Sequence, residues 1–89
     1  MQTKNWEDEL KEGGYTPMHS HHDGPDFEYS EHEHPVDMAH VILEGSMTIW
    51  INDKKITVVR GQIIKIPKLC SHRVQVGAEG CTYVNAVRI

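Results

Sequence analysis

Residues 32–45 read His-Glu-His-Pro-Val-Asp-Met-Ala-His-Val-Ile-Leu-Glu-Gly, and the two histidines that open this stretch direct the interpretation of the whole chain. On an extended strand successive side chains point to opposite faces, so His32 and His34 would share one face and Glu33 would take the other. Neutral imidazole nitrogens bind divalent zinc, iron, nickel and copper. We therefore predict that His32 and His34 form part of a metal site inside a β-barrel.

The runs of residues around this stretch predict an all-β fold. Short runs rich in β-branched and aromatic residues recur along the chain and are separated by Gly, Pro and Asn-Asp, a pattern typical of a β-sandwich or barrel. We expect a turn at residues 44–46 and a hairpin turn at residues 52–54. The expected strands cover residues 26–32, 38–43, 47–51, 55–59, 63–66, 73–76 and 82–87.

The first part of the chain is expected to precede the barrel rather than to belong to it. We divide the chain into a lead-in segment, residues 1–25, and a single barrel domain, residues 26–89. Asn5 can cap a short helical turn that Gly13 and Gly14 end. Residues 15–25 contain two prolines and a glycine and are expected to be irregular.

Histidine is the unusual residue type of this sequence. The chain of 89 residues has seven histidines, and six of them fall between His19 and His40. We expect His19, His21 and His22 to lie in a solvated flexible loop; a lid over the barrel mouth and adventitious metal binding are the alternatives.

Composition excludes several classes of protein. A formal net charge of -4 and a pI near 5.9 argue against nucleic acid as the main partner, since a basic patch is its usual footprint. No stretch approaches the length of a membrane span and the first ten residues contain no apolar signal core, so we expect a cytoplasmic protein with no membrane partner. Cys70 and Cys81 lack Cys-x-x-Cys spacing, so we expect neither a disulfide scaffold nor a cysteine-rich zinc module.

Two spaced motifs connect these observations to a known family. His32, His34 and Gly45 fit a motif of a His-x-His pair followed by a glycine, and Gly61, Pro67 and His72 fit a second motif. The sequence resembles the cupins, which are double-stranded β-helix (jelly-roll) barrels. The resemblance covers residues 32 to about 76 and implies that His32, His34 and His72 are three metal ligands. The cofactor would be a divalent transition metal, with Fe, Ni, Zn, Mn and Cu not distinguished by three imidazoles.

The sequence departs from the family pattern where the family has a glutamate. Counted back from Gly45 that position holds Met38, and the alternative position holds Ala39. Met38 and His40 share a parity, so both are expected to point into the barrel. His40 is a candidate catalytic residue in the pocket, with direct ligation as the alternative. Met38 is expected to fill the pocket, with a thioether ligand as a minor alternative.

Parity and position predict the places of other residues near the expected pocket. His72 alternates with Val74 and Val76 on one face of its strand and should point inward. Tyr83 and Cys70 are expected at the substrate pocket, although core packing and a structural thiol are the simpler interpretations. Phe27 and Tyr29 are expected at one end of the barrel. Trp50 alternates out of phase with its neighbours and is expected on the outside, where it suggests a dimer contact.

The expected function follows from the charge of the site. Three neutral ligands leave the full dipositive charge of the metal uncompensated, so the centre should favour a small anionic chelating substrate. The family includes dioxygenases with three-histidine iron, and the resemblance therefore implies a dioxygenase-like enzyme. The alternatives are a non-catalytic module that binds or senses a small ligand on its metal, and a structural barrel with vestigial histidines. A chain this small buries limited surface on folding, so we expect a homodimer.

Overall fold

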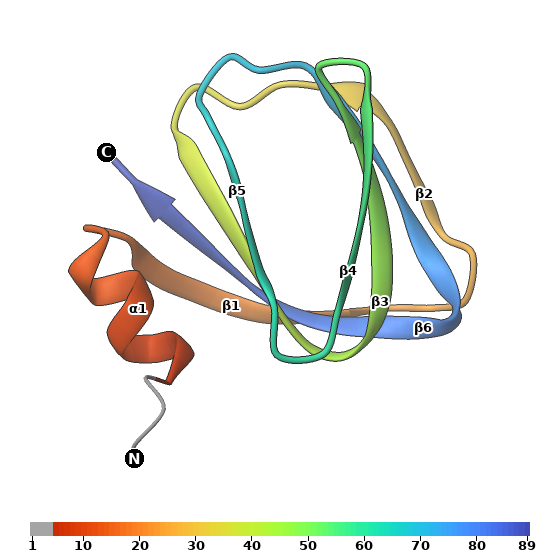
Figure 1. Ribbon diagram of the computed structural model, residues 1–89, viewed down its shortest axis with the longest axis horizontal. Coiled ribbons are helices and arrows are strands. Elements are labelled where there is room, and N and C mark those ends of the chain that lie inside the picture. Colours follow the sequence, from red (N-terminus) through yellow and green to blue (C-terminus); the bar gives the residue numbers. More distant parts are fainter. Residues whose placement is uncertain (1–4) are drawn as a thin grey trace.

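Two long strands form the centre of the structure, a computed structural model that describes residues 5–89. Strands β3 (Asp37–Ile51) and β6 (His72–Arg88) pair antiparallel from Asp37 opposite Arg88 to Ile51 opposite His72. Both strands bend midway, so that each of them contributes to two leaves of a barrel (Figure 1). The all-β prediction is confirmed.

Four shorter strands complete the two leaves. In one leaf β5 (Ile63–Ile66) pairs with the first part of β3, and β1 (Thr16–Asp23) pairs with the last part of β6. In the other leaf β4 (Lys54–Val59) pairs with the last part of β3, and β2 (Glu28–His32) pairs with the first part of β6. This arrangement of two packed antiparallel leaves is a jelly roll.

The predicted turn at residues 44–46 is wrong, because β3 runs through it as a bent strand. The register between β3 and β6 shifts between Ile42 and Glu44 and again between Gly45 and Met47. Gly45 has φ 78°, and a Cβ at this position would overlap the backbone carbonyl of Gly80 on the paired strand. A bulge with glycine at a positive φ bends a strand without ending it, so the chain turns a corner of the barrel here. Residues 77–81, expected between two strands, likewise belong to the continuous β6.

The inside of the barrel holds the main hydrophobic core. Its residues alternate along the strands with outward-facing ones, as expected for side chains that point to opposite faces. The buried members include Ile42, Met47, Ile49, Ile66, Val74 and Val76.

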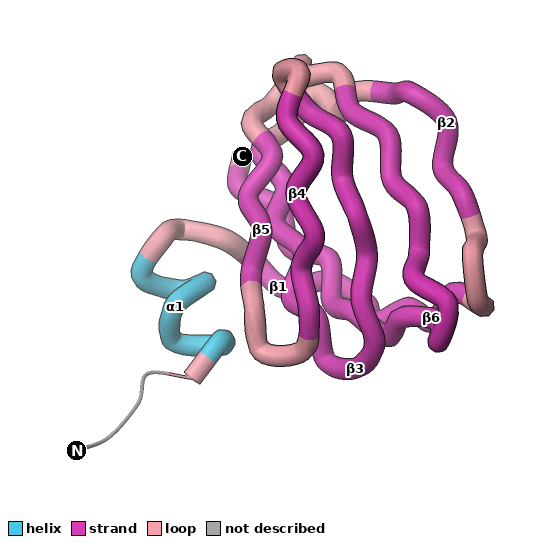
Figure 2. Tube along the Cα trace, turned by 45° about the vertical axis from the view of Figure 1, so that its right-hand side comes forward, coloured by secondary structure: helices cyan, strands magenta, loops and turns pink. Residues whose placement is uncertain are grey.

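A second core lies outside the barrel, under the helix α1 (Trp6–Glu12). Ala39 and Ala86 face each other across β3 and β6, and their small side chains leave room for Leu10, which is fully buried. Figures 1 and 2 show the helix beside the barrel, on the outer face of the leaf that contains β1 and β5. The predicted cap is confirmed, since Asn5 Oδ1 accepts a hydrogen bond from the Asp8 N–H at 2.8 Å and the helix ends at Gly13. None of the helices formed by residues 5–89 is long and apolar enough to cross a membrane.

The prediction that residues 15–25 are irregular is wrong, because Thr16–Asp23 form strand β1. Backbone pairing with β6 supplies the order that the polar sequence does not indicate: Thr16 lies opposite Val87 and Asp23 lies opposite Cys81. His19, His21 and His22 therefore lie on a strand, not in a flexible loop. The division of the chain at residue 26 stays a prediction.

Candidate metal centre

Three histidines from separate segments converge at one end of the barrel. His32 ends β2, His72 begins β6, and the two residues lie opposite each other in the antiparallel register. His34 lies in the loop after β2, where its backbone carbonyl accepts a hydrogen bond from the Leu69 N–H at 2.7 Å. One nitrogen from each of the three rings lies within 4.8 Å of the others. The structure thus brings together the predicted ligands, although only His32 of the His-x-His pair lies on a strand.

Backbone carbonyls fix which nitrogen of two of these rings faces the centre. Nδ1 of His32 lies 2.6 Å from the Ser30 carbonyl, and Nδ1 of His72 lies 2.9 Å from the Cys70 carbonyl. A carbonyl only accepts, so both Nδ1 atoms carry the proton and the Nε2 atoms of the neutral rings present lone pairs. Metal-binding histidines use this arrangement, in which the second nitrogen is held by a backbone or carboxylate acceptor.

The surroundings of His72 Nε2 indicate whether the site fits a metal. This atom is buried and has no hydrogen-bond partner among the described residues. A buried polar atom without a partner costs about 1–3 kcal/mol, so such an atom in a folded protein calls for an explanation. A metal that takes up the lone pair supplies one, and the three converging nitrogens make a donor set suited to a divalent transition metal.

The surroundings of His34 and His72 favour the neutral form of these two rings. Burial lowers the pKa of His34 below its usual value, and the neighbouring His32 and His72 lower that pKa further. Burial also lowers the pKa of His72, against the hydrogen bond to the Cys70 carbonyl, which raises it. Metal and proton compete for the same lone pair, so a lowered pKa favours metal binding at neutral pH.

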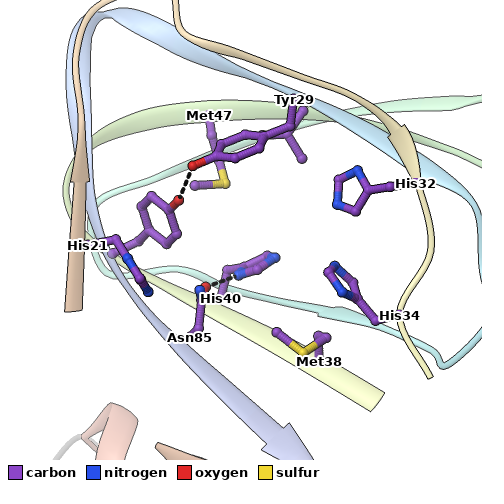
Figure 3. A pocket seen from close by; sticks show the side chains of 10 residues that line it. His21, Tyr29, His32, His34, Met38, His40, Met47 and Asn85 are labelled. Atoms are coloured by element: carbon purple, nitrogen blue, oxygen red, sulfur yellow. Dashed lines mark hydrogen bonds between the residues drawn. The ribbon is translucent and has the colours of Figure 1, made fainter. Parts of the chain in front are cut away.

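A cavity of about 130 Å³ opens beside the three histidines. An apolar cavity of about 150 Å³ holds one benzene molecule, so this volume suits a compact ligand of similar size. The cavity passes from the histidines along apolar side chains to polar groups on the far side (Figure 3). Its lining includes His21, Tyr29, His32, His34, Met38, His40, Met47, Val74, Tyr83 and Asn85.

Met38 lines this cavity, and it does so from the position where the family pattern has an acid. Its side chain is buried, and it lines the same cavity as the ring of His34 (Figure 3). The three-histidine set therefore has no carboxylate at this position. A metal held there would keep more of its positive charge than one with an acidic ligand.

His40 lines the same cavity but does not belong to the cluster of three. Its Nδ1 shares a hydrogen bond of 2.6 Å with Asn85 Oδ1 across the paired strands β3 and β6. Burial lowers the pKa of His40 to about 4, against the Asn85 hydrogen bond, which raises it. His40 is therefore a neutral imidazole at physiological pH, held in one orientation beside the site.

Tyr83, predicted at the pocket, lines it together with Tyr29. Both phenol groups donate a hydrogen bond to Asp23 Oδ2, each at 2.7 Å. The two hydroxyl oxygens lie 3.2 Å apart. The carboxylate at the end of β1 thus holds two tyrosines in the cavity wall.

Cys70 differs from the sequence-based expectation, because its side chain lies outside this cavity. The thiol faces a separate surface depression, where Sγ lies 3.7 Å from Asn52 Oδ1. The loop between Pro67 and His72 turns the side chain of Cys70 away while directing its carbonyl to Nδ1 of His72. The backbone of Cys70, not its thiol, contributes to the site.

Sequence reasoning missed three polar residues of the site. Asn85 shares the parity of Cys81 and Tyr83 along β6, so extending that alternation by two residues would have found it. His21 lines the cavity from β1, and Asp23 holds the tyrosines from the same strand. The polar sequence of β1 shows no hydrophobic alternation, so nothing in it indicated which side chains face the barrel.

Comparison with known proteins gives the family. The family described as "Cupin domain" matches residues 24–86. A conserved protein of unknown function from Streptococcus pyogenes is 27% identical, with a TM-score of 0.66 over 73% of this chain and 56% of that one. The chain thus spans about half the length of the Streptococcus protein. No curated protein gives a match.

Two further solved structures share the fold. A cupin-2 domain protein from Shewanella frigidimarina is 22% identical, with a TM-score of 0.68 over 93% of this chain and 91% of that one. A salicylate 1,2-dioxygenase mutant from Pseudoaminobacter salicylatoxidans is 18% identical, with a TM-score of 0.70 over 76% of this chain and 21% of that one. The jelly roll, the two spaced motifs and the match to residues 24–86 agree, and this chain belongs to the cupin family.

Proposed function

We propose that this cupin is a metal-dependent enzyme that acts on a small anionic chelating substrate, with dioxygenase-type oxidation as its reaction. His32, His34 and His72 would hold a divalent transition metal, which supplies Lewis-acid and redox chemistry when bound. The observation that carries the proposal is the convergence of three ring nitrogens, two of them with fixed tautomers, beside a ligand-sized cavity.

The residues around the cluster support an anionic substrate. The cluster itself contains neutral imidazoles, and the fourth position of the family pattern holds a thioether instead of a carboxylate. An anion that approaches the centre therefore meets an uncompensated positive charge. His40 faces the cavity as a neutral ring whose Nδ1–H donates to Asn85 Oδ1, so its Nε2 is able to accept a proton or a hydrogen bond from a bound substrate.

A salicylate 1,2-dioxygenase has the same fold as this chain, and this supports oxidation as the proposed reaction. The fold alone does not choose the reaction, because one fold serves many chemistries.

We also propose that the protein lies in the cytoplasm. The two free cysteines among the described residues fit a reducing compartment.

Metal content is the first test. Protein purified without a histidine tag should contain about one transition metal per chain, and His32→Ala and His72→Ala should each lose it. His22→Ala is the matched control, because His22 bonds Thr82 on the exposed side of β1 and lies outside the cluster. Absence of metal, or equal loss in the His22 variant, would contradict the proposed site.

Oxygen consumption is the second test. Iron-loaded protein should take up oxygen with one member of a panel of β-diketones, thiols and phenols, and the His72→Ala variant should not. Metal-loaded protein that consumes no oxygen with any of them, and that retains a ligand unchanged, would instead indicate a binding or sensing module.

A further inference from the structure

The wall of the cavity away from the three histidines is built around one carboxylate. Asp23 Oδ2 accepts a hydrogen bond from the hydroxyl of Tyr29 and another from the hydroxyl of Tyr83. Figure 3 shows the hydroxyl of Tyr29 on the side of the cavity that faces away from His32 and His34. These three residues, called here the acid–tyrosine cluster, come from β1, β2 and β6.

Counting protons shows what this cluster can offer a ligand. Each phenol has one proton, and an ionised carboxylate has none. Both protons are used within the cluster, since each hydroxyl donates to Asp23 and the two hydroxyl oxygens are 3.2 Å apart. The phenol oxygens of these two cavity-lining tyrosines therefore present lone pairs. Turning either proton toward a ligand would take a donor away from the carboxylate.

The phenols keep their protons at any ordinary pH. Burial raises the pKa of Tyr83, and the hydrogen bonds to Tyr29 and Asp23 raise it further. Burial also raises the pKa of Tyr29, although its hydrogen bond to Tyr83 acts in the opposite direction. This wall thus combines neutral hydrogen-bond acceptors with one negative charge behind them.

The two sides of the cavity therefore have opposite character. On one side three imidazoles can hold a cation, and on the other side the acid–tyrosine cluster accepts hydrogen bonds. Apolar side chains line the space between, among them Met38, Met47 and Val74. With a volume of about 130 Å³, the cavity admits a ligand about the size of benzene.

We propose that the ligand of this site is a compact dipolar molecule, with an anionic group that binds the metal and a hydroxyl or ammonium group that the acid–tyrosine cluster receives. This inference rests on the proposed metal site and adds the chemistry of the other end of the ligand. A purely apolar tail leaves the acceptors of Tyr29 and Tyr83 without a donor. A second anionic group is repelled by Asp23.

Three probes of matched size test the proposal without requiring turnover. Butanoate, 3-hydroxypropanoate and β-alanine each have one carboxylate and the same number of non-hydrogen atoms, and they differ only in a methyl, hydroxyl or ammonium tail. Their dissociation constants are measured from the visible absorption of cobalt(II)-loaded protein. The hydroxyl and ammonium probes should each bind about tenfold more tightly than butanoate, since one net hydrogen bond to a buried acceptor has about that effect.

Variants show whether the acid–tyrosine cluster causes the preference. In the unaltered protein the dissociation constant of butanoate should exceed that of 3-hydroxypropanoate. Tyr29→Phe and Tyr83→Phe should each bring the ratio of these two dissociation constants closer to one. Asp23→Asn should reduce the preference for β-alanine more than that for hydroxypropanoate, because it removes the charge. Tyr15→Phe and Asp26→Asn are the matched controls, since Tyr15 packs under α1 and Asp26 is exposed in a loop. Ratios of dissociation constants are compared because a variant that only disturbs the structure would weaken the binding of all three probes alike.

The outcomes separate the two proposals. Protein that takes up no cobalt contradicts the metal site and, with it, this inference. Cobalt-loaded protein that binds the three probes equally contradicts the dipolar ligand and leaves the metal site standing. A preference that persists unchanged in Tyr29→Phe, Tyr83→Phe and Asp23→Asn contradicts the assignment to this cluster. The comparison of probes on the unaltered protein decides the question even where a variant does not fold.

Discussion

At the residue scale, position 38 sets the charge of the candidate centre. Met38 is buried in the cavity wall where the family pattern has a glutamate. We predict that Met38→Glu binds a divalent metal about tenfold more tightly than the unaltered protein, since an anionic oxygen ligand adds a favourable charge interaction. The same variant should bind the anionic probe butanoate more weakly, because the site then holds less net positive charge.

Met38→Gln is the control for that prediction. Glutamine has nearly the shape of glutamate without its charge, so it should leave the metal affinity within a few-fold of the original. Titration of both variants with cobalt(II), followed by absorption, gives the comparison. Equal affinities in the two variants would mean that side chain 38 does not reach the metal.

The lowered pKa of His40 predicts how the stability of the protein depends on pH. Its pKa is lowered to about 4 in the folded chain, mainly by burial, whereas the unfolded chain has the ordinary value near 6.5. Between these two pKa values the unfolded state binds a proton that the folded state does not bind. The free energy of unfolding therefore falls as the pH falls. The slope for one such group is about 1.4 kcal/mol per pH unit.

Urea unfolding of metal-free protein tests this behaviour. We predict that between pH 7 and pH 4.5 the unaltered protein loses about 2 kcal/mol more of its free energy of unfolding than His40→Gln does. Glutamine can keep a bond to Asn85 but does not titrate. His22→Gln, which changes an exposed histidine on β1, should lose as much as the unaltered protein. Identical pH profiles for the unaltered protein and His40→Gln would show that His40 is not held neutral.

At the element scale, helix α1 belongs to the packed structure. Leu10 is fully buried between the helix and the outer face of β3 and β6. We predict that Leu10→Ala lowers the free energy of unfolding by about 2–5 kcal/mol, as for other large-to-small core changes. Lys11→Ala, an exposed change in the same helix, should cost less than about 0.5 kcal/mol. Urea unfolding of both variants measures the difference, and a small effect of Leu10→Ala would mean that the helix is only loosely attached.

The strands show which parts of a fold a local pattern can predict. The expected runs 55–59 and 63–66 match β4 and β5 almost to the residue, because turns bound them and β-branched residues fill them. Strand β1 was missed, because its residues are polar and mostly exposed and its order comes from pairing with β6 at the other end of the chain. The sequence predicts a turn at Gly45 instead of the observed corner, because a local sequence does not show whether a glycine ends a strand or bends it.

The residues of the candidate site also divide into those that the sequence predicts and those that it does not. His32, His34 and His72 were found from motif spacing, and the structure brings their rings together. The acid–tyrosine cluster was not found, because Asp23 meets Tyr83 only through the register between β1 and β6. Residues whose roles depend on a spacing within one segment can be read from the sequence, whereas those joined by long-range pairing cannot.

At the scale of the whole molecule, the two places suited to a dimer contact differ in what already covers them. Trp50 lies on the outside of the barrel as expected, but the Arg73 guanidinium stacks 3.8 Å from its ring centre and Lys55 lies 5.8 Å away. Strand β1 is at the end of the sheet order, and residues 16–22 are exposed. A long exposed edge strand is a template for pairing with another chain. Strand β1 is therefore a better candidate than Trp50 for the contact in the dimer that the sequence predicts.

We therefore predict a homodimer joined through β1, with a mass twice that of the chain of 10.2 kDa. Met18 is the exposed apolar side chain of this strand, so Met18→Lys should weaken the dimer about tenfold or more by placing like charges in a contact related by twofold symmetry. Leu69→Lys changes an equally exposed apolar residue in the loop before β6 and should leave the mass unchanged. Sedimentation equilibrium over a range of concentrations measures both. A single species of monomer mass at all concentrations contradicts the dimer, and a dimer that Met18→Lys leaves intact contradicts its assignment to β1.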